Sequence, residues 1–401
     1  MNKYDFAQVD KALESAVISN LDKAKGSDDD KSSFLTKVFP GATLLIGKGR
    51  EILFYKAVGH KQLLPETSLL DEETVFDVAS LTKALVTTTL IMKLVDKKLI
   101  SIDKRVSHII SQFNLLKKET ITIQQLLNHS SGLPAYRRFF EEYQSYRSSL
   151  GLISGQSGKQ FIISEICNSE LENPPGRVAN YSDLGFIILG ELIEQLYGGR
   201  SLDLISQQEI FSQLSLKHSG YIDLTKLRSR RILVNHDKIA STTKCPFRNR
   251  ILTGEVQDEN CYIMGGVAGH AGLFSNASDI FELSCELLDC FHGRSDFISK
   301  DTIRRFWTRD SNSTLINLPN QPISTWALGF DTPSDSNSSA GDLISKNAVG
   351  HLGYTGTSIW IEPEKEITII LLTNRVHPNT NNNKIKKFRP HIHNLIFEAL
   401  R

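Results

Sequence analysis

Ser80 and Lys83 are the residues whose types and spacing most directly suggest chemistry. A serine hydroxyl is nearly inert as a nucleophile until a base accepts its proton. A lysine three residues further along projects from the same face of a helix, so Ser80-Leu-Thr-Lys83 would place a nucleophile beside a base. The spacing alone does not decide, because the chain holds two further copies, at Ser101/Lys104 and Ser241/Lys244.

The surroundings of Ser80 separate it from these copies. An apolar approach, residues 75–79, leads to Ser80, and a long helical pattern follows it. The apolar residues of that pattern are Ala84, Leu85, Leu90, Ile91, Leu94 and Val95. A serine that begins this helix puts its own amide at the positive end of the helix dipole, where an oxyanion would gather charge. The structural alternative is that Ser80 is only the N-cap of the helix.

Tyr181-Ser-Asp183 is the second segment that could do chemistry. It follows the turn signal Asn173-Pro-Pro-Gly176 and precedes an apolar helix, so the tyrosine hydroxyl could enter a cleft. A nearby lysine ammonium lowers the pKa of a tyrosine and favours the phenolate. Such a phenolate could take the Ser80 proton and pass it to a leaving group. The alternative is that Tyr181 packs the loop and Asp183 is a helix N-cap.

His351-Leu-Gly353 is the third segment, and it lies in the glycine-rich run 350–360 that leads into a strand. Glycine lets a substrate backbone lie close against a strand edge. The amide of the next residue, Tyr354, could then be a second oxyanion donor. The alternative is a hairpin turn with a structural histidine.

The elements that must position these segments follow from hydrophobic patterning. We expect an amphipathic helix over 4–22, a polar linker over 23–33, a hairpin of strands 42–47 and 51–56, mainly helical structure over 80–290, a long surface loop over 310–346, strands over 357–362 and 366–373, and a last helix over 383–400. Strands at both ends with helices between them predict one sheet assembled from both termini, which is an α+β organisation.

This organisation predicts a discontinuous α/β sheet domain, 1–85 with 345–401, and a mainly helical domain, 86–344. The active site would lie in the cleft between them. A chain of 401 residues is long enough for two such domains.

Composition excludes some classes of partner. The 46 basic and 45 acidic residues nearly cancel, which gives no support to binding of nucleic acid or a membrane surface. We see no apolar signal segment and no membrane span. The cysteines are odd in number and lack Cys-x-x-Cys spacing, which favours reduced thiols and a cytoplasmic location; they are Cys167, Cys245, Cys261, Cys285 and Cys290.

Two other patterns predict little chemistry. His391 and His393 would point to different faces of the last helix, so a metal site is not expected there. The glycine-rich run 265–272 lacks the Gly-Lys-Ser/Thr ending of a phosphate loop. Its His270 is instead a candidate to line a substrate cleft.

Taken in order, the three segments resemble the serine β-lactamase/penicillin-binding family, and within it the branch of class C β-lactamases, D-aminopeptidases and esterases. The stretches that carry the likeness are 76–83, 126–134, 175–183 and 350–374. The resemblance covers most of the chain from about Pro40 to Leu400.

The resemblance implies an antiparallel sheet flanked by helices beside a helical domain, with no metal or organic cofactor. It implies Ser80 as the acylated nucleophile, Lys83 as the proton relay and Tyr181 as general base and acid. The amides of Ser80 and Tyr354 would form the oxyanion hole. The further substrate-binding candidates are Asp183, His351, Gly353 and Asn128.

Departures from the family pattern concern the substrate. Many relatives have asparagine where this chain has Asp183, and an ionised aspartate only accepts hydrogen bonds. His351 and Leu352 stand where lysine and threonine often grip a substrate carboxylate. These changes favour an ester, or a small amide recognised without a terminal carboxylate, over a β-lactam.

Two alternatives stay open. The first is a D-amino-acid peptidase or amidase, or a weak β-lactamase, acting on cell-wall fragments. The second is a catalytically silent member that binds an acyl ligand. In each case the partner is a small molecule, and the oligomeric state is not predicted.

Overall fold

A computed structural model describes residues 4–18, 35–150, 155–309 and 324–401 of the chain. The predicted linker over 23–33 and residues 310–323 of the predicted long loop lie outside the described residues. None of the helices within the described ranges is both long and apolar enough to cross a membrane.

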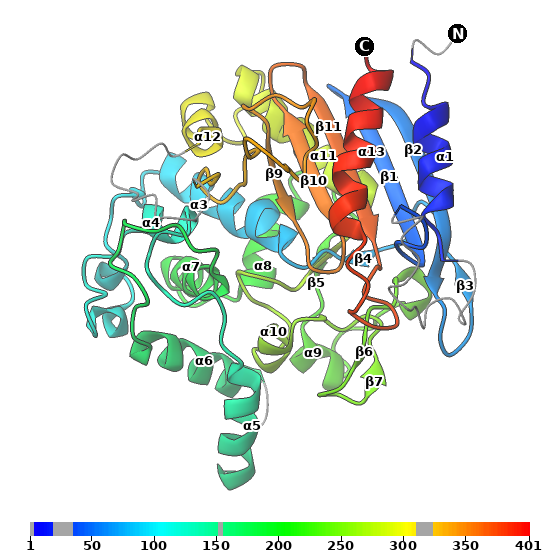
Figure 1. The fold of residues 1–401 in the computed structure, drawn as a ribbon. Coiled ribbons are helices and arrows are strands. Elements are labelled where there is room, and N and C mark those ends of the chain that lie inside the picture. Colours follow the sequence, from blue (N-terminus) through cyan, green and yellow to red (C-terminus); the bar gives the residue numbers. More distant parts are fainter. Residues whose placement is uncertain (1–3, 19–34, 151–154, 310–323) are drawn as a thin grey trace.

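A six-stranded antiparallel sheet joins the two ends of the chain (Figure 1). Its order is β3-β2-β1-β11-β10-β9. The strands are β1 (Gly41–Lys48), β2 (Glu51–Gln62), β3 (Ser68–Leu69), β9 (Val349–Leu352), β10 (Ser358–Glu362) and β11 (Ile367–Thr373). The termini meet where β1 pairs with β11, with Ala42 opposite Thr373. The predicted α+β class and the sheet built from both termini are therefore confirmed.

Helices cover both faces of this sheet because β1 is apolar on both sides. Leu44 and Ile46 pack with α1 (Ala7–Ser15) and α13 (Ile385–Ala399), which lie side by side on one face (Figure 1). Leu45 points the other way into the larger apolar cluster, which includes α11 (Ala277–His292). The inner strands are thus buried between two layers.

The first helix is shorter than predicted. The apolar pattern over 4–22 predicts one helix, but α1 ends at Ser15. Val17 instead forms a parallel bridge with Phe39, and the Ile18 amide donates to the Phe39 carbonyl at 2.8 Å. β-branched residues suit this extended pairing. Residues 19–22 lie outside the described residues.

The middle of the chain is mainly helical, as predicted, with short strands that the pattern did not indicate. The helices are α3 (Thr89–Asp96), α4 (Ile123–Leu127), α5 (Phe139–Leu150), α6 (Gln156–Asn168), α7 (Asp183–Leu196), α8 (Leu202–Ser206), α9 (Leu224–Arg228), α10 (Glu259–Ile263) and α12 (Lys300–Trp307). Further turns are the π-helical Lys83–Thr88 and Gln207–Phe211 and the 3₁₀ segments Val106–His108, Ser111–Asn114 and His236–Lys238.

The short strands form two small sheets. One has the order β4-β8-β5, and the other pairs β6 with β7. They are β4 (Phe76–Asp77), β5 (Gly220–Tyr221), β6 (Lys244–Cys245), β7 (Arg250–Ile251) and β8 (Leu273–Ser275). β4 matters for the site, because it leads directly into Ser80. The division into two domains at residues 85/86 and 344/345 stays a prediction.

Close packing of α11 on the sheet depends on a glycine in β1. A Cβ added at Gly47 would lie 2.1 Å from the ring of Phe281 on α11. We therefore expect Gly47→Ala to lower the free energy of unfolding by about 2 kcal/mol through overpacking. Gly220→Ala is the matched control, since a Cβ there meets nothing within 4 Å. Urea unfolding of both variants measures the difference, and equal midpoints would contradict this packing.

Candidate active site

Ser80 lies at the end of a strained turn that directly follows β4. Ala79, just before it, has φ +49°, a left-handed conformation that is uncommon for a residue with a Cβ. Asp77 holds this turn: its Oδ1 accepts from the Ala79 amide at 2.9 Å and its Oδ2 from the Gln257 amide at 2.6 Å. Burial raises the pKa of the Asp77 carboxyl to about 6, although both amides lower it.

The helix after Ser80 begins one residue later than predicted and widens at once into the π-helical turn Lys83–Thr88. Such turns are rare and often occur at functional sites. The Ser80 hydroxyl accepts from Lys83 Nζ at 2.9 Å. This contact joins the two side chains of the motif, whereas an N-cap serine would accept from a backbone amide of the helix.

Lys83 is fully buried, and three of the oxygens around its ammonium lie within 3.0 Å of Nζ. Besides Ser80 Oγ, these are Asp183 Oδ1 at 2.7 Å and the backbone carbonyl of His270 at 3.0 Å. Ser80 Oγ and the His270 carbonyl accept hydrogen bonds from Nζ, and Asp183 is its ion-pair partner. Burial by itself would lower the pKa of Lys83, but Asp183 and Tyr181 together outweigh it and the pKa lies above its ordinary value. Lys83 is therefore charged at rest.

Asp183 is available for this pair because the preceding residue caps α7. The N-cap is Ser182, whose Oγ accepts from the Gly185 amide at 3.3 Å. The sequence alternative, in which Asp183 is the N-cap, is therefore wrong. Asp183 lies in the first turn of α7, where a carboxylate is favoured by the helix dipole.

Tyr181 completes the group, in the phenol form. Its ring centroid lies 4.9 Å from Lys83 Nζ, and its hydroxyl interacts with both Lys83 and Ser80. Burial raises the pKa of Tyr181, and the Lys83 ammonium offsets only part of that rise. Lys83 does lower the pKa of Tyr181, as expected. The prediction of a lowered pKa overall is wrong, because the increase caused by burial is larger.

Aromatic rings fix the position of Tyr181. Trp326 stacks on it with centroids 5.4 Å apart and planes at 29°. The ring centroid of His129 lies 4.3 Å from that of Trp326, and His129 Nδ1 accepts from the Ser182 amide at 3.1 Å. The tyrosine loop is thus held by packing and by its backbone.

The turn between β9 and β10 is docked onto the segment that precedes Ser80. Thr355 Oγ1 donates to the Asp77 carbonyl at 2.8 Å, and Thr357 Oγ1 donates to the Val78 carbonyl at 3.0 Å. A Cβ at Gly353 would lie 2.6 Å from the same Val78 carbonyl, so this close approach requires glycine. The turn carries Tyr354 towards Ser80.

Two backbone amides at this junction have no acceptor within the described structure. They belong to Ser80 and Tyr354, and both residues line one cavity. Unpaired amides are what an oxyanion hole requires. The predicted role of the two amides stays a prediction, and this geometry supports it.

His351 lines the same cavity as a neutral histidine. Its Nδ1 donates to the Leu352 carbonyl at 2.9 Å, and its Nε2 is buried without a partner among the described residues. Burial lowers its pKa to about 3, and repulsion from Lys83 contributes. His351 therefore adds no positive charge near neutral pH to replace the family lysine.

The cavity has a volume of about 910 Å³. Ser80, Tyr181, Asp183, His270, His351, Gly353 and Tyr354 are all among its lining residues. Asn128 is not among the described lining residues: it is buried, and its Oδ1 accepts from the Ser130 amide and hydroxyl at 3.1 and 2.6 Å. The structure thus brings the sequence candidates together except Asn128, which instead stabilises the loop before Leu133.

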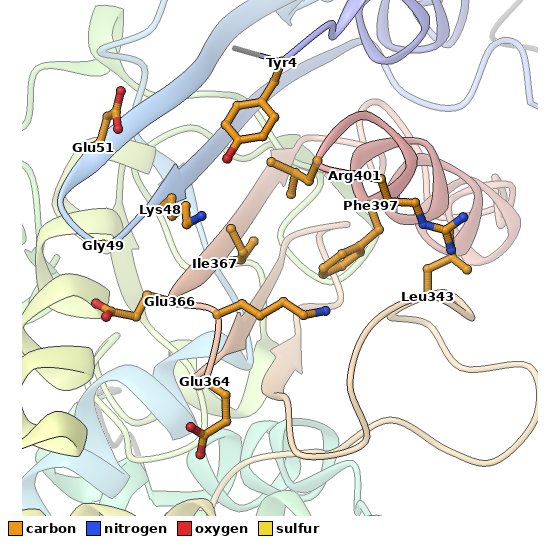
Figure 2. Close-up of a pocket in the computed structure, with 12 residues that line it drawn as sticks. Tyr4, Lys48, Gly49, Glu51, Leu343, Glu364, Glu366, Ile367, Phe397 and Arg401 are labelled. Carbon is orange, nitrogen blue, oxygen red and sulfur yellow. The ribbon is translucent and has the colours of Figure 1, made fainter.

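A second cavity, of about 790 Å³, lies at the far end of the sheet (Figure 2). Lys48, Glu366 and Phe397 are among its lining residues. Its described lining contains no serine, threonine or cysteine, the residues that most often carry acyl transfer. Among the described residues, no group of three His, Cys, Asp or Glu could hold a metal ion.

Sequence reasoning missed several residues that line the active-site cavity, among them Asp258, Trp326 and Arg389. Asp258 Oδ1 lies 3.0 Å from Nε2 of buried His270, the residue whose carbonyl accepts from Lys83. Asp258 is the N-cap of α10, and the sequence can suggest such a cap. The sequence does not show that this aspartate also contacts His270. Trp326 lies inside the predicted loop, and Arg389 resembles the other cations of the last helix.

The chain belongs to the β-lactamase family, whose model matches residues 17–392. It is 31% identical over 362 residues to the N-acetylmuramyl-L-alanine amidase of Bacillus subtilis strain 168, covering 84% of this chain and 78% of the relative. It is 29% identical over 360 residues to a putative D-alanyl-D-alanine carboxypeptidase of Escherichia coli K12, covering 84% and 79%. The resemblance noted from the motifs is confirmed, and the chain is a β-lactamase-type hydrolase.

The fold is shared with more distant solved structures. EstCE1, a hydrolase with promiscuous acyltransferase activity, superposes with a TM-score of 0.68 at 16% identity, covering 97% of both chains. At this identity the likeness concerns the fold alone.

The buried Lys83–Asp183 pair predicts a stability effect. Asp183→Asn would leave a buried ammonium without its carboxylate, so we expect the free energy of unfolding at pH 7 to fall by about 3 kcal/mol. The pair raises the folded-state pKa of Lys83. Its stabilisation is therefore complete below about pH 10, the ordinary value for lysine, and is lost as pH rises through the folded-state pKa.

Asp335→Asn is the matched control, because Asp335 pairs with Lys346 at 3.4 Å and both side chains are more than half exposed. We expect it to change stability by less than about 1 kcal/mol. Chemical denaturation of both variants at several pH values makes the measurement. Equal stability of the two variants at pH 7 would contradict the buried ion pair.

Proposed function

We propose that this chain is a serine hydrolase that forms an acyl-enzyme on Ser80. The observation that carries the proposal is the 2.9 Å contact of Ser80 Oγ with Lys83 Nζ in a cavity that also holds Tyr181 and two unpaired amides. A nucleophile, a proton-transfer group and oxyanion donors are the parts that acyl transfer needs.

Proton transfer has to start from a charged lysine and a neutral tyrosine. In the proposed step, Lys83 gives one proton to Asp183 Oδ1, 2.7 Å away, and its freed lone pair takes the proton of Ser80. The Oγ–carbon bond forms while the π pair of the substrate carbonyl moves onto its oxygen, next to the two amides. When this intermediate collapses, Tyr181 donates its proton to the leaving group, and Lys83 returns a proton to Tyr181. Asp183 then replaces the proton of Lys83.

For the substrate, we propose a small amide with an anionic end, of the kind found in cell-wall peptide fragments. Two observations support this choice. The relatives at 31% and 29% identity bear the names of an N-acetylmuramyl-L-alanine amidase and a putative D-alanyl-D-alanine carboxypeptidase. Lys244 and Lys386 line the cavity with exposed side chains, where they would attract a carboxylate.

Ester hydrolysis is the second candidate. The cavity also presents Tyr136, Trp326 and Leu352, a surface that suits an apolar acyl group. EstCE1, which shares the fold, is a hydrolase with promiscuous acyltransferase activity. An ester substrate would use the same Ser80 chemistry and differ only in its leaving group.

Mass spectrometry after incubation with a labelled penicillin and with a p-nitrophenyl ester tests the acyl-enzyme. We expect an adduct on Ser80 that is absent from Ser80→Ala, because that variant lacks the nucleophilic oxygen. Ser241→Ala is the matched control, since it removes the serine of another Ser-x-x-Lys copy and should keep the adduct. No adduct with either probe would contradict the proposal and favour a catalytically silent member.

Turnover assays then separate the substrate classes. A D-alanyl-D-alanine peptide and a muramyl-L-alanine amide represent the anionic amides, and the p-nitrophenyl ester represents the second candidate. Faster turnover of either amide supports the first substrate class. Turnover of the ester alone would refute it and leave ester hydrolysis.

A further inference from the structure

Two arginines brace the turn that carries the Tyr354 amide. Arg375 donates to the Tyr354 carbonyl from Nε at 3.0 Å and from Nη2 at 2.6 Å. Arg389, on α13, donates from Nη2 to the carbonyls of Gly353 at 3.2 Å and Thr357 at 2.8 Å. Each of the two peptide groups that flank Tyr354 therefore has a guanidinium on its carbonyl oxygen.

The Gly353 carbonyl and the Tyr354 amide belong to one peptide group. A cation that hydrogen-bonds the carbonyl oxygen draws electron density towards it, which makes the N–H at the other end a stronger donor. The same contact fixes the direction of that N–H, because the peptide group is planar. Arg389 thus acts on the Tyr354 amide through a single rigid unit.

Arg389 is an unusual cation for this position. It is 5% exposed, and none of the described carboxylates forms an ion pair with it. Its Nε is buried without a hydrogen-bond partner, and Arg375 is the nearby charge that matters. Burial lowers the pKa of Arg389 to about 9, and repulsion from Arg375 adds to this. A buried charge without an opposite charge is costly for the fold.

A negative charge beside the Tyr354 amide arises during the reaction. When Ser80 Oγ adds to a substrate carbonyl, the π pair moves onto the oxygen beside the Tyr354 amide. The guanidiniums of Arg375 and Arg389 bind the carbonyls on either side of the Tyr354 amide, and no described carboxylate pairs with Arg389. The surroundings of this amide therefore have a positive potential before substrate binds. Such preorganisation stabilises a transition state without reorganisation of the site.

We propose that Arg389 is a positioning residue of the oxyanion hole, which holds and polarises the Gly353–Tyr354 peptide group. The inference rests on the proposed acylation of Ser80 and adds a role for the last helix. It does not require Arg389 to touch the substrate. Its effect falls on the rate of acylation and on the binding of tetrahedral adducts, and leaves ground-state substrate binding unchanged.

Stopped-flow acylation by p-nitrophenyl acetate, together with the affinity for phenylboronic acid, tests this role. Phenylboronic acid forms a tetrahedral adduct with a serine, so one of its oxygens occupies the oxyanion hole. For Arg389→Gln we expect both the acylation rate constant and the boronic acid affinity to fall by about 10²-fold, with an unchanged dissociation constant of the complex that precedes acylation. Arg389→Lys should recover part of the loss, because an ammonium keeps the charge but lacks the guanidinium fork.

Lys387→Gln is the matched control, since it removes a positive charge from an exposed position two residues away on α13. We expect it to match wild type in both measurements. A folded Arg389→Gln with wild-type acylation and boronic acid affinity would overturn the inference, as would a loss confined to the dissociation constant of the complex that precedes acylation. If Arg389→Gln does not fold, the same two measurements on Arg389→Lys decide. A wild-type enzyme without any Ser80 adduct would refute the proposed function, and this inference with it.

Discussion

The buried ammonium of Lys83 is the constraint on which the site depends. A charge with no exposed surface is costly unless oxygen atoms surround it, and three separate parts of the chain place oxygens beside this ammonium. The turn after β4 brings Ser80, the first turn of α7 brings Asp183, and the glycine-rich run 265–272 brings the His270 carbonyl. The packing of these three segments around the site therefore depends on the buried charge of Lys83.

The sheet has a different role. It positions two backbone amides, those of Ser80 and Tyr354, that have no hydrogen-bond acceptor among the described residues. Pairing of β1 with β11 brings the C-terminal strands beside the N-terminal ones, and the β9–β10 turn then docks on Asp77 and Val78 through two threonines. Arginine side chains take up the carbonyls of that turn. These hydrogen bonds hold the backbone through its carbonyl groups, so the Ser80 and Tyr354 amides need no acceptor of their own to keep their positions.

Sequence patterning predicted the sheet from both termini and the group around Ser80, because period-two strands and a serine at a helix start are local signals. It failed where the outcome depends on long-range packing. The length of α1 is set by the pairing of Val17 with Phe39. The protonation of Tyr181 is set by burial. Arg389 gave no signal, because only the fold brings the last helix into contact with the β9–β10 turn.

The most direct test of this account is a crystal structure of the enzyme with phenylboronic acid. The account predicts boron bonded to Ser80 Oγ and one boron-bound oxygen about 3 Å from the amide nitrogens of both Ser80 and Tyr354. Lys83 Nζ should remain in contact with Ser80 Oγ and Asp183. Boron bound to another side chain, or an oxygen that faces away from the Tyr354 amide, would contradict it.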